Sequence, residues 1–157
     1  MWQPDTNSFH MPWGEMLITL HDVELILGVP AYGAVVDHRL SREQLIRVVQ
    51  DDLGLALTGG LGFNATELHA VATSRQTSQS HQVRAACYLQ YILGTSLFSD
   101  KSDNIVPARL WPLLQDVSSV GRFAWGAACL AYLYQNLGQT SKVNAKELAG
   151  CWSLLEA

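Results

Sequence analysis

Four side chains near the N-terminus have the chemistry of a general acid/base group. His10, Glu15, His21 and Asp22 lie close together in the sequence. Imidazole and carboxyl groups can move protons when a fold holds them within hydrogen-bond reach in a pocket. Asp22 also stands where a carboxylate caps a helix and interacts favourably with its dipole. The sequence therefore allows a catalytic cleft with His10, Glu15 and Asp22, but a structural role for Asp22 is the simpler interpretation.

Two patterns that imitate metal sites fail on their spacing. Residues 100–104 place oxygen ligands at alternate positions, as a calcium loop does, but the sixth and twelfth positions hold Ile105 and Trp111 where glycine and a bidentate acid are needed. Three cysteines, Cys87, Cys129 and Cys151, are far apart and set among apolar neighbours. They show no zinc-binding spacing, so we predict buried, reduced thiols in an intracellular protein. No metal or other cofactor is predicted.

Two further motifs are incomplete. The glycine cluster at residues 59–62 is not followed by the lysine and hydroxyl residues of a phosphate-binding loop, so we interpret it as a plain loop. Residues 19–30 resemble the first half of a helix-turn-helix, but the next helical signal begins only near Ser41. The turn of that motif spans about three or four residues, and the spacing argues against it.

Most of the sequence patterns around these residues predict α-helices. Residues 9–18 alternate around a Pro-Trp-Gly turn, which predicts a short hairpin or extended arm. Capping-box patterns begin at Thr19 and Ser41. Further helices are expected over residues 64–72, over 83–93 ending at Gly94, over 123–137 as the central helix, and over 144–155 as a closing helix. The predicted fold is mainly α, a single compact helical domain with a small N-terminal β-hairpin or extended arm.

Composition narrows the class of protein. Hydrophobic residues make up 48% of the 157 residues and charged residues 15%, with a formal net charge of −4. This is typical of a folded, core-rich domain and shows no basic stripe for nucleic acid. No apolar stretch is long enough to span a bilayer, so no membrane association is predicted.

Seven segments, taken in order, resemble a known family. They are residues 9–16, 19–30, 84–94, 97–102, 110–114, 125–134 and 150–151. Their order and spacing are similar to the plant mobile domain, the "aminotransferase-like" domain of MAINTENANCE OF MERISTEMS proteins and of many plant transposons. The resemblance implies one plant mobile domain over residues 1–157. The family usually continues into an aromatic stretch where this chain ends, so the resemblance leaves three expectations open: a domain trimmed at its C-terminus, a compact relative, or part of a larger protein.

The resemblance also implies a function without established catalytic residues. It points to a plant nuclear protein, from a host gene or a transposon, linked to transposable-element silencing, gene expression and genome integrity. A PP7-type phosphatase-like protein is the implied partner. The aminotransferase label would need a pyridoxal-phosphate lysine, and the only lysines are Lys101, Lys142 and Lys146, all in expected loops or helix starts, so we treat the label as nominal.

Three hypotheses remain open from the sequence. The leading one is a non-enzymatic nuclear protein-interaction module that binds partners, or itself, through the exposed aromatic residues Trp2, Trp111 and Trp152. The second is a nucleic-acid-binding domain whose fold gathers a basic patch from Arg39, Arg42, Arg47, Arg75 and Arg84. The third is an enzyme or its remnant that uses the cleft with His10, Glu15 and Asp22.

Overall fold

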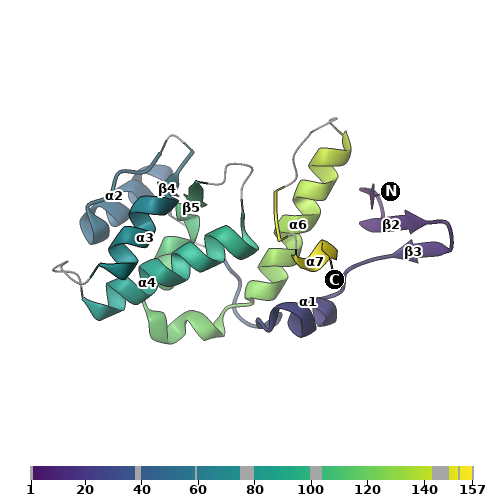
Figure 1. Ribbon diagram of the computed structural model, residues 1–157, viewed down its shortest axis with the longest axis horizontal. Helices are drawn as coiled ribbons and strands as arrows, with labels where there is room; N and C mark the ends of the chain where they lie inside the picture. The colour runs from purple at the N-terminus through teal and green to yellow at the C-terminus, as the bar shows by residue number, and fades with distance from the viewer. Residues whose placement is uncertain are drawn as a thin grey trace. The chain divides into compact units, whose positions relative to one another are not determined.

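The computed structural model describes residues 2–37, 40–58, 60–74, 80–99, 104–142, 149–151 and 153–156. The chain divides into two compact units, which we describe separately. Unit 1 comprises residues 1–35 and 123–157, and unit 2 comprises residues 36–122. The fold is mainly helical with a small N-terminal sheet, as predicted (Figure 1). That residues 1–157 act as one domain stays a prediction.

Unit 1 begins with a three-stranded antiparallel sheet of β1 (Trp2–Gln3), β2 (Ser8–Met11) and β3 (Gly14–Met16). Met11 pairs with Gly14, so Pro12 and Trp13 form a two-residue hairpin turn. The predicted hairpin is therefore confirmed, and β1 extends it. The Trp2 ring packs against Phe9 and Tyr134, which joins the sheet to the helical part of the unit.

The helices of unit 1 are α1 (Leu20–Leu27), α6 (Trp125–Lys142) and the short α7 (Ser153–Glu156). The capping box predicted at Thr19 is present, and Gly28 ends α1 in the left-handed conformation. Because Gly126 has no side chain, the start of α6 can lie close to the segment that follows α1. The N–H of Gly126 donates to the carbonyl of Pro30 at 2.8 Å. The buried side chain of Val23 faces this contact.

Unit 2 is a cluster of helices with a two-stranded antiparallel sheet. Its strands are β4 (Gly62–Asn64) and β5 (Ile105–Pro107). Its helices are α2 (Arg42–Leu53), α3 (Ala65–Thr73), α4 (His81–Ile92), the π-helix η1 (Leu93–Leu97), the 3-10 helix η2 (Ala108–Leu110), α5 (Trp111–Leu114) and the 3-10 helix η3 (Val117–Arg122). The capping box at Ser41 and the terminating role of Gly54 are confirmed.

Gly94 does not end its helix, contrary to our prediction. The backbone continues beyond it as η1, where the Phe98 N–H donates to the Leu93 carbonyl. A terminating glycine usually adopts a left-handed conformation, and Gly94 does not. Instead it lies against β5, where an added Cβ would stand 2.3 Å from Cγ1 of Val106. Close packing is the reason for this glycine.

Two helix boundaries near the C-terminus also differ from the prediction. α6 begins at Trp125 and runs beyond Gly138 to Lys142, because an isolated glycine with open space around it weakens a helix without stopping it. Of the closing helix expected over residues 144–155, the structure has α7 from Ser153. Residues 143–148 and 152 lie outside the described residues.

Candidate functional site

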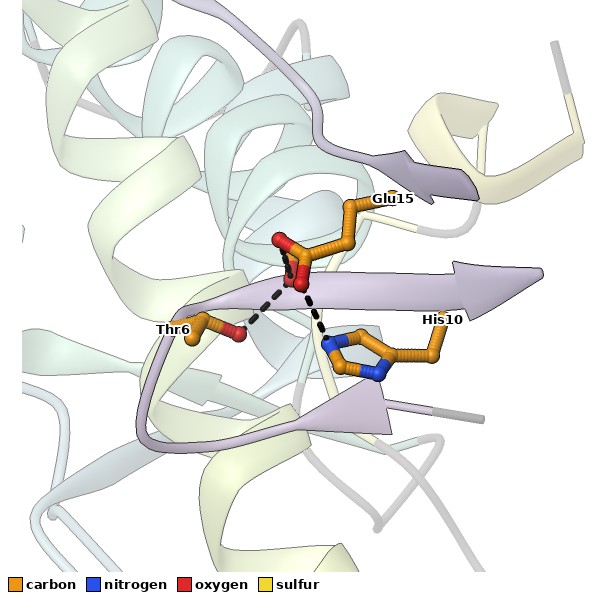
Figure 2. A network of polar contacts seen from close by, with 4 residues as sticks. Thr6, His10 and Glu15 are labelled. Carbon is orange, nitrogen blue, oxygen red and sulfur yellow. Dashed lines mark hydrogen bonds and ion pairs between the residues drawn. The ribbon is translucent and has the colours of Figure 1, made fainter. Parts of the chain in front are cut away.

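A polar network lies on the N-terminal hairpin (Figure 2). His10 and Glu15 stand directly opposite one another on β2 and β3, with 3.0 Å between His10 Nε2 and Glu15 Oε1. The other oxygen of Glu15 accepts a hydrogen bond from the Ser8 hydroxyl at 3.3 Å, and Ser8 is 2.7 Å from the Thr6 hydroxyl. The strand register thus brings together two of the predicted acid/base residues.

The order of contacts in this network is not that of a nucleophile activated by a base. Catalysis by serine needs the hydroxyl to donate to the imidazole that takes its proton. Here both Ser8 and His10 contact Glu15, and Ser8 is almost fully buried while His10 and Glu15 are exposed. This exposed contact is an ion pair only when His10 is protonated, and an exposed ion pair contributes about 0 to 1 kcal/mol. The network stabilises the hairpin.

Asp22 does not join the network of His10 and Glu15 but contacts Thr19 at the start of α1. Its carboxylate accepts hydrogen bonds from the backbone N–H and the hydroxyl of Thr19, both at 2.7 Å. These two bonds hold the pKa of Asp22 below its ordinary value. Asp22 is thus the third residue of the capping box that Thr19 begins. The structure does not bring Asp22 together with His10 and Glu15, so the third hypothesis, a cleft with these three residues, is wrong.

The Thr19 cap gives a testable prediction. We expect Thr19→Ala to lower the free energy of unfolding by about 1 kcal/mol at pH 7, because the Asp22 N–H and carboxylate both lose a partner. A carboxylate with a lowered pKa stabilises the fold above its ordinary value, near 3.8, and this contribution is lost as the pH falls through the lowered pKa. Urea unfolding at pH 7 and pH 2 should show the cost shrinking in acid.

A matched control is the Asn64 cap of α3, whose uncharged side chain accepts from the N–H groups of Thr66 and Glu67. Asn64→Ala should cost a similar amount at both pH values. An acid-independent cost for Thr19→Ala would show that the Asp22 carboxylate contributes little to the cap.

A shallow groove of about 290 Å³ lies beside α2 in unit 2. Ile46 and Leu57 contribute apolar walls and Arg42 and Gln50 contribute polar groups. This volume is at the lower limit for a small-molecule site. In the part of the chain that the structure describes, no group of three His, Cys, Asp or Glu side chains could hold a metal ion, and no helix is long and apolar enough to cross a membrane.

The predicted aromatic surface is wrong at two of its three positions. Trp2 is only 7% exposed and packs between Phe9 and Tyr134. Trp111 is 1% exposed, and its indole N–H donates to Asp52 at 2.8 Å. Trp152 lies outside the described residues. Large aromatic side chains bury much apolar area, and the indole rings of Trp2 and Trp111 both lie in the core.

Other apolar side chains are exposed in their place, and most of them belong to unit 1. We call seven of them the exposed apolar set: Trp13, Met16, Leu17, Leu25, Ile26, Tyr32 and Val35. They all lie in residues 13–35, from the hairpin turn through α1 to the segment after it. Sequence reasoning missed this set, although the apolar residues on more than one side of α1 were a signal for it.

The five arginines of the predicted basic patch are distributed as follows. Arg42 and Arg47 are exposed on α2, and Arg84 is half-buried on α4. Arg39 and Arg75 lie outside the described residues. Whether the five gather into one patch stays a prediction.

Comparison with known proteins decides the family. The family model described as "Plant mobile domain" matches residues 1–157. The chain belongs to the plant mobile domain family. No solved structure matches it.

Curated relatives of this plant mobile domain come from Arabidopsis thaliana. "Protein MAIN-LIKE 2" and "Protein MAINTENANCE OF MERISTEMS" are each 33% identical to it over 99% of the chain, which corresponds to 24% and 34% of their lengths. A "Serine/threonine-protein phosphatase 7 long form homolog" is 29% identical over 99% of the chain and 12% of its own length. The chain thus spans from 12% to 34% of the length of these relatives.

The family resemblance predicted from sequence is therefore confirmed, and the structure gives its segments a physical role. Residues 19–30 form the capped helix α1 and its exit, residues 84–94 run from α4 into η1, and residues 125–134 form the buried start of α6. Residue 150 is a glycine with φ of 128° that packs against Leu133. The segments that identify this plant mobile domain are mostly those that build its two cores.

Proposed function

We propose that this plant mobile domain is a non-enzymatic protein-interaction module that works in the nucleus. The nuclear role, and the link to transposable-element silencing, gene expression and genome integrity, rest on its resemblance to the MAINTENANCE OF MERISTEMS family. The observation that carries the interaction role is the exposed apolar set of unit 1. These seven side chains lie in one segment of the chain, residues 13–35, and exposed apolar surface is a feature of binding sites.

The helix α1 shows why this exposure is unusual. Val23 is fully buried on its inner side, while Leu25 is 71% exposed and Ile26 is 42% exposed. At 100° per residue Ile26 lies about 60° from Val23, at the edge of the buried side, whereas Leu25 lies about 160° away, on the opposite side of the helix. A helix that only covers its own core carries polar residues there. Burying a Leu or Val side chain in a partner contributes about 1.5 to 3 kcal/mol, so a few such contacts support specific binding.

The partner we propose is a PP7-type phosphatase-like protein. The support is the relative named as a phosphatase 7 long form homolog, which carries a segment matching 99% of this chain. Two domains that share one polypeptide in one protein can meet as separate chains in another. Self-association through the same set is the other arrangement that the proposal includes.

The test replaces exposed members of the set with charge. Leu25→Glu with Val35→Glu alters side chains that are 71% and 78% exposed, so the fold should be retained. Tyr88→Glu is the matched control, because Tyr88 is a half-exposed apolar residue on α4 of unit 2. We expect the double variant to lose at least about tenfold in recovery of phosphatase-like and other nuclear partners from plant nuclei.

Both variants should keep the circular dichroism spectrum and melting temperature of the parent protein. Equal recovery of nuclear proteins by the parent, the double variant and the control would contradict the proposal.

The alternative, nucleic-acid binding, has less support, because the formal net charge is −4. Phosphate contacts make affinity fall steeply with salt. Titration of duplex DNA between about 50 and 200 mM salt distinguishes the two functions. We expect no salt-dependent affinity, and a steep salt dependence would favour the alternative.

A further inference from the structure

The strand β3 forms an open edge of the N-terminal sheet. The sheet order is β1-β2-β3, so β2 pairs on both sides, whereas β3 pairs with β2 alone among the described strands (Figure 1). All three residues of β3 are exposed, and the apolar side chains of Met16 and Leu17 are 53% and 52% exposed. An edge strand presents N–H and C=O groups that can pair with another extended chain. β3 therefore offers a partner both backbone groups and apolar side chains.

The strand register determines which backbone groups point away from β2. Met11 and Gly14 close a two-residue turn, so they form the first hydrogen-bonded pair of the ladder. Hydrogen-bonded pairs alternate with non-hydrogen-bonded ones, so Met16 also bonds to β2, whereas Glu15 does not. Within a trans peptide group, as here, the C=O and the next N–H point in opposite directions. The N–H and C=O of Glu15 and the N–H of Leu17 therefore point outward from the sheet.

The side chains of this edge determine which residues a pairing strand would carry. Side chains alternate between the two faces of a sheet, so Glu15 and Leu17 lie on one face and Met16 on the other. The Glu15 side chain is 57% exposed, and its carboxylate can accept more hydrogen bonds than those from Ser8 and His10. A lysine or arginine opposite Glu15 complements its charge. Apolar residues opposite Met16 and Leu17 would bury exposed apolar surface.

We propose that β3 binds an extended peptide segment of a partner protein as a fourth strand of the sheet. The segment carries a basic residue opposite Glu15 and apolar residues opposite Met16 and Leu17. In this mode of recognition, main-chain hydrogen bonds supply affinity and side chains supply specificity. The edge carries part of the exposed apolar set, so the inference rests on the interaction function proposed above. A second copy of β3 is a poorer occupant, because the strand itself contains no basic residue.

The test selects binding peptides from a random peptide library displayed on phage, with the whole protein as bait. We expect the selected peptides to share a lysine or arginine next to apolar residues. Leu17→Pro removes the outward N–H but keeps an apolar side chain, and proline is tolerated where an edge N–H faces solvent. It should weaken binding of the selected peptides by roughly tenfold or more. Leu17→Val, the matched control, keeps the N–H and should bind like the parent protein.

Two further measurements identify the mode of binding. N-methylation of a selected peptide should abolish binding at the amides that face β3 and leave binding unchanged at the amides between them. Amide hydrogen exchange should slow at Glu15 and Leu17 when the peptide binds, and should stay unchanged at Gly14 and Met16, which already bond to β2. Glu15→Gln should remove the preference for a basic residue while it keeps the fold.

The N-methylated peptides and the exchange measurement decide the proposal even if Leu17→Pro fails to fold. Selection of no peptide, equal binding by Leu17→Pro and Leu17→Val, or unchanged exchange at Glu15 and Leu17 would overturn it. Peptides that bind Leu17→Pro normally but are lost by Leu25→Glu with Val35→Glu would also overturn binding at this edge, while the proposed interaction function would stand.

Discussion

Replacing Trp111 by alanine is expected to destabilise unit 2 by about 3 to 5 kcal/mol. The indole is 1% exposed, and its ring meets Phe63 edge to face with centroids 6.1 Å apart. Its N–H donates to Oδ2 of Asp52 at 2.8 Å, and the same oxygen accepts from Gln115 at 2.6 Å. Alanine would leave a large cavity and remove one of the two donors to Asp52. Urea unfolding followed by circular dichroism measures the loss.

Two further variants separate the packing of Trp111 from its hydrogen bond. Asp52→Ala leaves the buried indole N–H without its acceptor and should cost about 1 to 2 kcal/mol. Asp51→Ala changes the neighbouring exposed carboxylate on the same helix and should cost less than about 0.5 kcal/mol. If Trp111→Ala cost no more than Asp52→Ala, the indole would not be a packing centre of unit 2.

The second large effect is expected at Gly94. Gly94→Val should cost about 3 kcal/mol, because the added side chain must occupy space already filled by the stiff, fully buried Val106. An added Cβ alone would also approach Cδ of Pro107 to 3.4 Å. The strand β5 and the π-helix η1 would have to separate. Thermal unfolding should show a lower midpoint, and amide exchange should be faster in both elements.

Gly138→Val is the matched control, since Gly138 also lies inside a helix but has nothing within 4 Å of an added Cβ. Valine has a helix propensity equal to or better than glycine, so this variant should stay within about 0.5 kcal/mol of the parent protein. Similar losses at both positions would mean that helix propensity, and not contact with Val106, explains the glycine at position 94.

Local signals were the most reliable part of the sequence prediction. The caps at Thr19 and Ser41 were predicted correctly because each depends on residues within three or four positions. The two-residue turn at Pro12 and Trp13 is local in the same way. Such features form wherever the chain folds, so they can be recognised without knowing what packs against them.

The candidate site was harder to predict because it depends on which apolar residues are left uncovered. Trp2 and Trp111 are aromatic residues of the type found at interaction surfaces. In the structure, however, Trp2 packs against Tyr134 and Trp111 packs against Phe63, and both lie in the core. From their hydrophobicity alone, Leu25 and Val35 would be assigned to the core, yet both side chains are exposed. Hydrophobicity along a chain gives the amount of apolar surface, whereas tertiary contacts decide which part of it is buried.

By itself, the sequence determined the family, the mainly helical class, the hairpin and the caps, because these follow from local geometry and from an ordered set of segments. Only the tertiary structure decided that Gly94 permits close packing, that Asp22 belongs to a cap and not to a cleft with His10, and that Trp111 is buried with its N–H bonded to Asp52. Each of these depends on atoms brought together from different elements, or on which of several possible partners a side chain takes. Spacing along the chain does not encode those distances; the packing of the helices sets them.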